Sequence, residues 1–288
     1  MLNRLREILH FVIHLRWHYQ VGILSGGYLL GGLYAGQMDW QVWIAQFINV
    51  HLLLFGGATA YNSFWDKDEG PVGGLRHPPP MKKWMWSASL MMQFMGALWA
   101  LRVGPVFEAF YLLSMLLFWL YSTPHARWKG HPYLSLIAIG ISTGTNSFWM
   151  GYLAAGYSGW IVPMVASLGV AAVILSLYPV SQIFQVEEDE QRGDLTLARQ
   201  IGSLGLRRFF QVFFITGIFL VAITFPVGRP WLGILFGMIG LLLSAWIRWT
   251  LLSITGSRED YNKVMRIKYI TSMAFVLFIG VMLVFKHT

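Results

Sequence analysis

Nine long apolar stretches, separated by short polar segments, run along almost the whole chain. They lie near residues 20–36, 41–61, 84–102, 105–121, 133–156, 160–184, 207–226, 231–249 and 267–285. Each is about 17 to 25 residues long, which is the length that an α-helix needs to cross a bilayer. Connections as short as Met38–Asp39 predict antiparallel pairs of neighbouring helices. The pattern therefore predicts an all-α polytopic membrane protein with nine transmembrane helices.

A shorter amphipathic segment precedes the first stretch. In residues 1–17, arginine and histidine side chains alternate with leucine, isoleucine and phenylalanine at helical spacing. The segment lacks the long apolar core and the small-residue cleavage site of a signal peptide. We therefore expect a helix that lies along the membrane surface. Because no soluble segment interrupts the spans, residues 1–288 are expected to form a single membrane domain.

Composition supports a membrane protein and excludes several other classes. Hydrophobic residues make up 56% of the chain and charged residues only 12%, about half of what a soluble domain carries. A soluble enzyme, a disordered chain and a disulfide scaffold are thereby excluded. The absence of cysteine also excludes a thiolate nucleophile and a cysteine-based metal site.

The distribution of lysine and arginine predicts the orientation in the membrane. Of the 21 such residues, 18 fall at the N-terminus and in four loops on one side of the predicted bundle. By the positive-inside rule, the N-terminus is then cytoplasmic and the C-terminus external, as an odd number of spans requires. The net charge of +8 therefore reflects loops beside a lipid bilayer rather than binding to nucleic acid. We expect the bilayer to be a bacterial inner membrane.

Eight of the thirteen acidic residues cluster in two loops on this same basic side. They are Asp66, Asp68 and Glu69 after the second span, and Glu187, Glu188, Asp189, Glu190 and Asp194 after the sixth. Asn62, Asp66 and Glu69 are spaced i, i+4 and i+7, which places their oxygens on one helix face. Gln185 and Asp189 repeat the i, i+4 spacing. Solvated loops that neutralise their own basic residues are the alternative interpretation.

The two acidic loops offer oxygen ligands for a metal ion. Mg²⁺ prefers such ligands and is usually held by one or two carboxylates together with substrate phosphates. Two facing acidic loops therefore predict a diphosphate bridged by Mg²⁺. The candidate metal ligands are Asn62, Asp66, Asp68, Glu69, Glu188 and Asp189. The candidate diphosphate-binding cations are Arg76, Arg127 and Lys129, because arginine and lysine stabilise a departing phosphate.

Three segments of the chain resemble motifs of the UbiA-type intramembrane prenyltransferases. Asn62-Ser-Phe-Trp-Asp66 and the acids after it resemble the family's first motif, Asn-Asp-x-x-Asp-x-x-x-Asp. The segment from Gln185 to Gly202 resembles the second, in which Asp-x-x-x-Asp precedes a glycine and Thr-Leu. Tyr121-Ser-Thr-Pro-His-Ala-Arg127-Trp-Lys129 is similar to the signature Tyr-Ser-x-Pro-x-x-Arg/Lys-x-Lys. The resemblance covers nearly the whole chain.

The resemblance implies both a fold and a reaction. The fold is nine helices around a central cavity, with the three motif loops on the cytoplasmic side. The reaction is Mg²⁺-assisted ionisation of a prenyl diphosphate and transfer of its isoprenoid chain to a lipophilic, aromatic or quinone-type acceptor within the membrane. Catalytic roles are implied for Asp66, Asp189, Tyr121 and Lys129, and substrate-binding roles for Asn62, Arg16, Arg127, Lys129 and Gln185. Arg76 stays a substrate-binding candidate from its charge alone.

Three positions depart from the family pattern. Ser63 stands where the family has an aspartate after the asparagine, and Gly70 stands at the third acid of the first motif. Gln185 replaces the first acid of the second motif. We hypothesise that acids within one helical turn compensate for these losses, namely Asp68 or Glu69 and Glu187 or Glu188.

Polar and aromatic residues within the spans are further candidates. His51 shares a face of the second span with Asn62, and it is either a substrate ligand or a neutral histidine bonded to a neighbouring helix. Asn146 in the fifth span is a candidate acceptor ligand, although interhelical hydrogen bonding is the commoner use of such residues. Phe148 and Trp149 are candidates for the aromatic wall that a carbocation requires.

Three other functions remain open from the sequence. A terpene cyclase of the same fold would ionise the diphosphate and let the isoprenoid chain attack itself. A non-catalytic family member would keep the fold after losing the acids. A transporter or channel is disfavoured, because the acids lie at the ends of spans rather than at mid-membrane and nine spans do not divide into equal halves.

Overall fold

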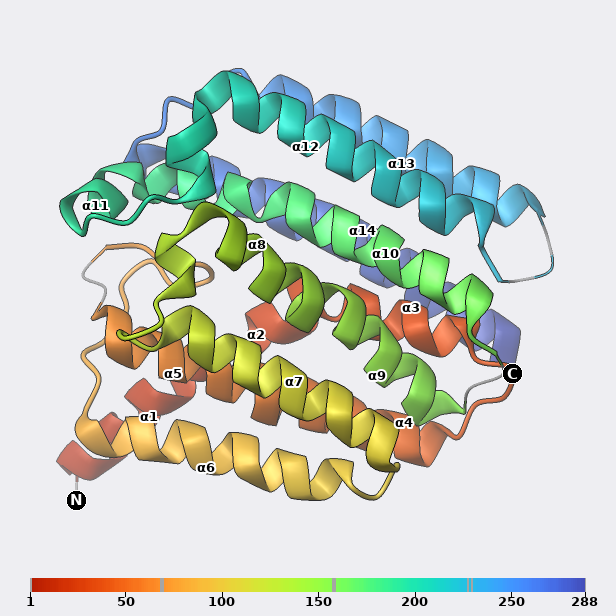
Figure 1. Cartoon of the computed structure of the whole chain (residues 1–288), viewed down its shortest axis with the longest axis horizontal. Coiled ribbons are helices and arrows are strands. Elements are labelled where there is room, and N and C mark those ends of the chain that lie inside the picture. Colours follow the sequence, from red (N-terminus) through yellow and green to blue (C-terminus); the bar gives the residue numbers. More distant parts are fainter. Residues whose placement is uncertain (1, 68–69, 157–158, 227, 229, 288) are drawn as a thin grey trace.

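The computed structural model describes residues 2–67, 70–156, 159–226, 228 and 230–287. Within these ranges every regular element is a helix, apart from one isolated bridge between Val72 and Leu75. The long helices lie side by side in one bundle, and α1 begins at the end opposite to the one where α14 finishes (Figure 1). The all-helical class expected from the sequence is confirmed.

Each predicted span corresponds to a helical segment, and several of these segments contain a short π- or 3₁₀-helical stretch. In chain order the elements are α1 (Leu2–Leu15), α2 (Trp17–Tyr19), η1 (Gln20–Leu24), α3 (Gly26–Tyr34), α4 (Trp40–Ile48), η2 (Asn49–Phe55), α5 (Gly56–Asp66), α6 (Lys83–Ala100), α7 (Pro105–Ser122), η3 (Trp128–Gly130), α8 (Pro132–Ile139), η4 (Gly140–Thr145), α9 (Asn146–Ala155), α10 (Ile161–Leu177), η5 (Pro179–Gln185), α11 (Val186–Gln191), α12 (Leu197–Ile223), α13 (Pro230–Leu251), η6 (Arg258–Asp260) and α14 (Tyr261–His287).

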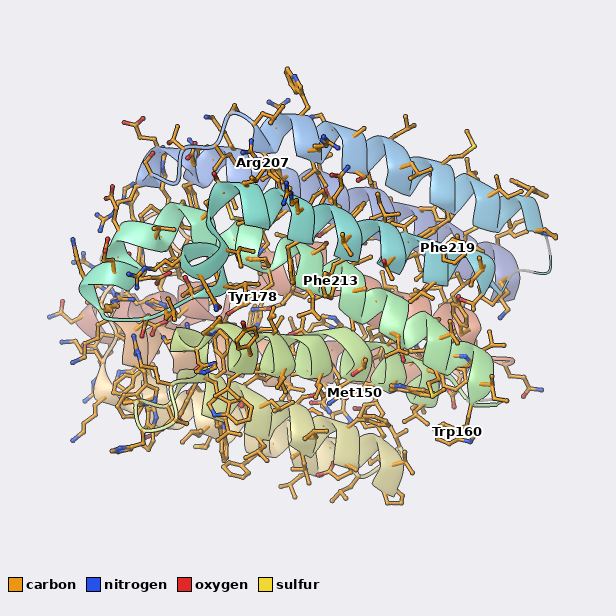
Figure 2. All side chains as sticks on the ribbon, turned by 45° about the horizontal axis from the view of Figure 1, so that its top comes forward. Met150, Trp160, Tyr178, Arg207, Phe213 and Phe219 are labelled. Atoms are coloured by element: carbon orange, nitrogen blue, oxygen red, sulfur yellow. The ribbon has the colours of Figure 1, made fainter. Side chains whose placement is uncertain are left out.

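Six segments of the described chain are long and apolar enough to cross a membrane. They are Trp40–Asp66, Pro105–Ser122, Ile161–Gln191, Leu197–Ile223, Pro230–Leu251 and Arg258–Lys286. The predicted spans near 20–36, 84–102 and 133–156 fall on helices outside this set, so the number of nine crossings is not confirmed. Large apolar side chains lie on the outer surface, among them Phe219 on α12 and Trp160 before α10 (Figure 2). Such a surface suits lipid better than water.

The N-terminal segment folds as the expected helix, α1. Leu5 and Leu9 on one face are exposed, whereas Phe11 and Leu15 are buried in a cluster with Met85 of α6. The helix is therefore anchored to the bundle on one side and exposes leucine side chains on the other. Its position along the membrane surface stays a prediction.

Helices α3 and α9 approach each other closely, and this contact fixes the position of α3 in the bundle. A Cβ atom on Gly31 would collide with the carbonyl oxygen of Phe148, and one on Gly151 would collide with that of Tyr28. Tyr28 and Phe148 are fully buried beside this contact. In lipid the hydrophobic effect does not drive helices together, so small residues that permit close packing are the main source of association. The two glycines therefore determine how near α3 lies to α9.

Three of the long helices are interrupted by π-helical stretches, namely η1, η2 and η4. A π-helical turn breaks the regular hydrogen-bond ladder of the α-helix, and such turns are frequent at functional sites. Each stretch contributes side chains to one cavity inside the bundle, including Gln20 from η1, Phe55 from η2 and Thr143 from η4. The irregular turns therefore surround a single space.

Replacing Gly31 with alanine should lower the stability of the protein in detergent, because the added methyl group would force α3 away from α9. We expect a loss of about 1–3 kcal/mol, the usual cost of overpacking a well-packed interior. The midpoint of thermal unfolding measures this loss. Gly280→Ala in α14 is the matched control, because no atom lies within 4 Å of a Cβ built there. Equal midpoints for the two variants would contradict the inference.

Candidate active site

Two adjoining cavities lie between the helices and share Arg16, Asn62, Gly73 and Tyr121 in their walls. The larger one, here called the apolar chamber, has a volume of about 230 Å³. Its walls are mainly apolar and include Ile23, Leu24, Phe55, Ala58, Phe118, Ile139, Ile174 and Leu177. The smaller one, the polar pocket, has a volume of about 130 Å³. A pocket of charged and amide side chains therefore adjoins an apolar space.

The polar pocket lies where the two acidic loops meet. Asp66 is the last residue of α5, and Asp189 lies in the short helix α11. Both aspartates line the pocket, together with Tyr121, Lys129 and Gln185. The structure thus brings the three motif segments, which are far apart in the chain, to a single site.

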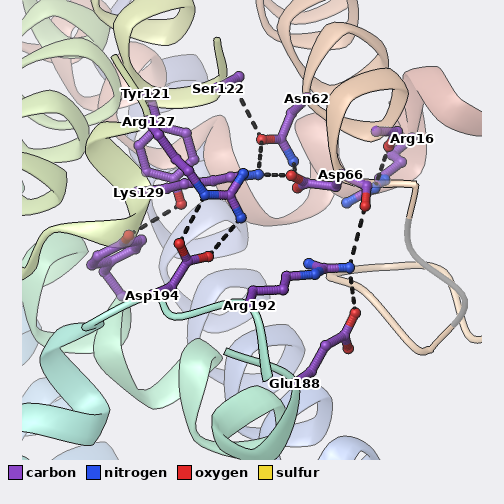
Figure 3. A network of polar contacts seen from close by, with 12 residues as sticks. Arg16, Asn62, Asp66, Tyr121, Ser122, Arg127, Lys129, Glu188, Arg192 and Asp194 are labelled. Atoms are coloured by element: carbon purple, nitrogen blue, oxygen red, sulfur yellow. Dashed lines mark hydrogen bonds and ion pairs between the residues drawn. The ribbon is translucent and has the colours of Figure 1, made fainter. Parts of the chain in front are cut away.

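A network of hydrogen bonds joins α5 to the loop after α7 (Figure 3). The amide Nδ2 of Asn62 donates to Oδ2 of Asp66 over 2.7 Å. Oδ1 of Asn62 accepts hydrogen bonds from the Ser122 hydroxyl at 2.9 Å and from Nζ of Lys129 at 3.4 Å. Lys129 also forms an ion pair with the carboxylate of Asp66. Asn62 therefore holds the carboxylate and the ammonium group in one orientation.

Lys129 lies in the short turn η3 between two long helices, and its side chain is only 11% exposed. Burial lowers the pKa of Lys129 to about 7, while the nearby carboxylates of Asp194 and Asp189 act in the opposite direction. The charged form of this lysine therefore depends on nearby anions. A diphosphate in the polar pocket would be such an anion.

The second acidic loop is held against the same turn by a bidentate ion pair. Nε of Arg127 donates to Oδ1 of Asp194 at 2.8 Å, and its NH2 group donates to Oδ2 at 2.7 Å. The backbone N–H of Leu195 also donates to the carbonyl of Gly130 at 3.0 Å. One oxygen of Asp189, in turn, accepts from the Thr196 hydroxyl at 3.1 Å. Arg127, expected from the sequence to bind diphosphate, thus has a structural partner.

Arg192 links the two acidic loops directly. Its NH2 group forms an ion pair with Glu188 at 2.6 Å and donates to the backbone carbonyl of Asp66 at 3.2 Å (Figure 3). Arg192 lines the polar pocket, whereas Glu188, a predicted metal ligand, is not among the lining residues. The position of α11 beside the end of α5 is therefore fixed in part by this arginine.

Arg16 lies at the junction of the two cavities. It adopts a left-handed backbone conformation, with φ of 50°, between α1 and α2. Its guanidinium donates to the Gly73 carbonyl at 3.0 Å and to the Ser63 hydroxyl at 2.7 Å. Ser63, where the family has an aspartate, is therefore a partner of Arg16.

Several predicted site residues are not brought to either cavity. Arg76 is exposed in the loop before α6. His51 is fully buried, with Nδ1 2.9 Å from the Phe47 carbonyl and its ring stacked on Phe47 at 4.2 Å. Asn146 donates to the Ser114 hydroxyl at 2.9 Å, as expected of an interhelical bond. Phe148 and Trp149 pack in the core rather than on a cavity wall, and Asp68 and Glu69 lie outside the described residues.

Four polar side chains that line the polar pocket were not proposed as site residues from the sequence, namely Gln182, Arg192, Asp194 and Thr196. Arg192 and Thr196 fall within the second motif, where the resemblance itself was a signal. Asp194 belongs to the acidic cluster and could have been paired with a basic residue. Gln182 precedes Gln185 by three residues at the end of a span, and this helical spacing places both amides on one face.

The donor set of the polar pocket fits a metal ion that is bound together with a substrate. Asp66, Asp189 and Gln185 supply carboxylate and amide oxygens around one space. In the described ranges no three His, Cys, Asp or Glu side chains are grouped closely enough to hold a metal by themselves. Mg²⁺ commonly takes one or two protein carboxylates and completes its shell with phosphate oxygens and water. The residues present therefore suit Mg²⁺ carried by a diphosphate.

Comparison with known proteins identifies a family. The sequence model of the UbiA prenyltransferase family matches residues 24–278. No curated protein sequence matches the chain. The fold is similar to a UbiA homolog from Archaeoglobus fulgidus bound to GPP and Mg²⁺, with a TM-score of 0.73, 14% identity, and coverage of 96% of this chain and 99% of that one. It is also similar to digeranylgeranylglyceryl phosphate synthase, with a TM-score of 0.67, 18% identity and the same coverage.

Replacing Arg127 with glutamine should destabilise the protein even without substrate, because it leaves the carboxylate of Asp194 without its bidentate partner. The Asp194 side chain is 9% exposed and that of Arg127 is 30% exposed, so we expect a loss of about 1–2 kcal/mol rather than that of a fully buried pair. The thermal midpoint in detergent reports the change. Arg76→Gln, at an exposed position in another loop, should leave the midpoint unaltered. An unchanged midpoint for Arg127→Gln would show that the pair contributes nothing.

Proposed function

The chain belongs to the UbiA prenyltransferase family, and we propose that it transfers an isoprenoid chain from a prenyl diphosphate to a lipophilic, aromatic or quinone-type acceptor inside the membrane. One observation carries the proposal: a polar pocket lined by the acids of two motif loops adjoins an apolar chamber. A prenyl diphosphate has the same two parts, a charged head and a hydrocarbon tail. Solved structures of similar fold bound to GPP or DMAPP with Mg²⁺ support it.

In the proposed reaction the diphosphate lies in the polar pocket and the isoprenoid chain in the apolar chamber. Mg²⁺ held by Asp66 and Asp189 would neutralise the charge on the diphosphate and so help it to leave. Lys129 and Arg192, which both line this pocket, would bind the diphosphate oxygens. Gln185 and Asn62 would orient these groups through their amides.

The bond between the first carbon of the isoprenoid chain and the diphosphate oxygen breaks, and its electron pair leaves with the diphosphate. An electron-rich atom of the acceptor then bonds to this carbon, and the proton that the acceptor loses passes to the departed diphosphate. Tyr121 lines both cavities, and its hydroxyl lies 3.1 Å from that of Tyr178. Its ring would therefore stand beside the carbon that becomes positive, where an aromatic face is stabilising. The apolar walls would keep water from quenching the cation.

The membrane arrangement that we propose has nine crossings in a single membrane domain, with the acidic loops and the N-terminus in the cytoplasm and the C-terminus outside. The acidic helix α11 lies at the same end of the bundle as α1, and the end of α14 lies opposite (Figure 1). This placement agrees with the positive-inside distribution of lysine and arginine. A bacterial inner membrane would provide the required orientation.

Replacing Asp66 or Asp189 with asparagine should each abolish most of the activity, because each change removes a negative charge from the proposed Mg²⁺ site without altering side-chain size. We expect a fall of about 10²–10³-fold in turnover of geranyl diphosphate. Glu190→Gln, in the same acidic loop but with its side chain 72% exposed, is the control and should remain active.

Products analysed with and without an added aromatic acceptor separate a transferase from a cyclase. A wild-type protein that binds no geranyl diphosphate with Mg²⁺ would instead be a non-catalytic family member.

Replacing Gln185 with aspartate should restore the family pattern and strengthen metal binding, since a third carboxylate would line the pocket beside Asp189. We expect half-maximal activity at a Mg²⁺ concentration about tenfold lower than for the wild type, from one added charge–charge contact. A Mg²⁺ titration at fixed geranyl diphosphate measures this. The control is Gln182→Glu, which adds a negative charge at a second amide of the polar pocket, the one whose oxygen accepts a hydrogen bond from the backbone N–H of Ala198. Comparison of the two variants separates the effect of the charge at position 185 from the effect of the net charge of the pocket. An unchanged Mg²⁺ requirement in Gln185→Asp would place position 185 outside the metal site.

A further inference from the structure

A further cavity lies where α13 ends and α14 begins, at the same end of the bundle as α11 (Figure 1). It is here called the α13–α14 pocket and has a volume of about 470 Å³. Its walls include Trp246 and Trp249 of α13 and Lys263 and Arg266 of α14. None of the described residues that line it also lines the polar pocket or the apolar chamber. The α13–α14 pocket is therefore a separate site.

The loop between the two helices closes on Asp260 and holds Lys263 at this pocket. Oδ2 of Asp260 accepts hydrogen bonds from the backbone N–H groups of Thr255 at 2.7 Å and Gly256 at 2.9 Å. Its Oδ1 pairs with Nζ of Lys263 at 3.1 Å. The same ammonium group donates to the Ser253 carbonyl at 2.6 Å. Because an ammonium group has three N–H donors, one remains available to a ligand.

Arg266 adds a second cation to the pocket. It follows Lys263 by three residues, on the same face of α14, and it is exposed. None of the described carboxylates lies within ion-pair distance of its guanidinium. Asp260 therefore balances one of the two cations, and the pocket has a net positive charge. A ligand that complements it is an anion.

Two tryptophan side chains place the pocket at the level of the lipid headgroups. Trp246 and Trp249 are three residues apart on one face of α13, and Trp249 is 73% exposed. An indole ring has an apolar body and one N–H donor, and it is enriched at the boundary between hydrocarbon and headgroups. The anions that a membrane offers at this boundary are the headgroups of acidic lipids.

Toward the other end of the bundle, both helices continue the walls of the pocket as stripes of exposed apolar side chains. On α13 the helical spacing of Trp249 and Trp246 is continued by Leu242, Met238 and Leu235. On α14 that of Lys263 and Arg266 is continued by Ile270, Met273 and Leu277. From Arg266 to Leu277 the α14 stripe is about 16 Å long, which matches the roughly 15 Å of hydrocarbon in one leaflet. The stripes therefore suit acyl chains.

The contact between α13 and α14 uses other side chains. The ring of Phe236 lies 5.2 Å from that of Phe275 and 5.8 Å from that of Phe278. Phe236 and Phe275 are buried, and neither belongs to a stripe. Both stripes are therefore left on the outer surface, where lipid can lie against them.

We propose that a phospholipid with a net negative charge binds in the α13–α14 pocket. Its phosphate lies against Lys263 and Arg266, its glycerol region lies beside Trp249, and its acyl chains follow the two stripes. Basic pockets between membrane helices commonly hold acidic headgroups in this way. A zwitterionic lipid would bring its own cation to the two basic side chains, so it is the weaker ligand. The inference goes beyond the proposed transferase function and does not rest on it.

The experiment compares two lipids that have the same acyl chains. Binding of anionic dioleoylphosphatidylglycerol and of zwitterionic dioleoylphosphatidylcholine to the full chain in nonionic detergent is measured by native mass spectrometry. The wild type should bind the anionic lipid about tenfold or more tightly, since each basic side chain near an acidic headgroup contributes about a fivefold factor. Equal affinities would overturn the proposal. Glycerol 3-phosphate has the phosphate without the acyl chains and should not compete; displacement of the lipid by an equal concentration of it would make the site one for free phosphate instead.

Substitutions assign the preference to the pocket. Arg266→Gln should weaken binding of the anionic lipid about fivefold and leave that of the zwitterionic lipid unchanged, whereas Arg266→Lys should keep the preference. Arg248→Gln is the matched control, because Arg248 is exposed at the same end of α13 but donates to Gln211 of α12 at 3.1 Å and does not line the pocket. It should bind both lipids as the wild type does. An equal loss in Arg248→Gln and Arg266→Gln would indicate general attraction to a basic surface and would contradict a defined site.

A second pair of variants tests the aromatic wall. Trp249→Ala should weaken binding of both lipids several-fold, because the indole contacts a part of the molecule that they share. Trp231→Ala, at the other end of α13 and also exposed, should leave both affinities unchanged. Unaltered binding in Trp249→Ala would be incompatible with a lipid in this pocket. Binding of geranyl diphosphate with Mg²⁺ should be the same in all these variants and the wild type, so failure of this inference is distinct from failure of the proposed function.

Discussion

The ion pair between Asp66 and Lys129 is the interaction on which the rest of the site depends. Each of these charges alone would be costly at a buried position, and together they are tolerated only with good geometry and further hydrogen bonds. Asn62 supplies that geometry by bonding both partners. Two further pairs, Arg127 with Asp194 and Arg192 with Glu188, surround the first. Because these contacts connect α5, η3 and the loop around α11, charge pairing determines how the three motif segments meet.

The cavity inside the bundle changes from charged to apolar along its length, and the helices explain this change. Charged side chains lie at the ends of α5 and α11 and in η3, where the chain turns and polar backbone groups are available. Deeper in the bundle the walls come from apolar side chains and from three π-helical stretches. A regular α-helix keeps one face inward from turn to turn, and a π-turn, with its extra residue, shifts the register of that face locally. The chamber is thus a consequence of backbone irregularity as much as of side-chain size.

The helices and the two acidic loops could be predicted from the sequence, because apolar length and helical spacing are local properties of the chain. The resemblance to a family then placed Asp66, Asp189, Tyr121 and Lys129 in one site, where the structure also brings them together. What the sequence could not supply were pairings between distant segments. Arg192 binds the carbonyl of Asp66 from 126 positions away, and no local pattern encodes that contact. Lys268 is one of the 18 basic residues that the sequence assigns to the N-terminus and the four loops of the predicted cytoplasmic side, although the packing of α14 against Tyr19 buries it. His51, by contrast, is held by a carbonyl on its own helix.

Each position that departs from the family pattern has a neighbour that accommodates it. At position 63 an aspartate would place a carboxylate beside Arg16, whereas the serine hydroxyl accepts a hydrogen bond from Arg16 and carries no charge of its own. At position 70 a Cβ would lie 3.3 Å from Oε2 of Glu188, so a carboxylate already stands where that side chain would begin. Gln185 keeps an amide in the polar pocket beside Asp189. Among the described residues, the carboxylates that line the polar pocket are Asp66, Asp189 and Asp194, and Lys129, Arg192 and Arg16 lie in the same walls. A diphosphate in this pocket would therefore meet three cations of the protein as well as the carboxylates proposed to hold Mg²⁺.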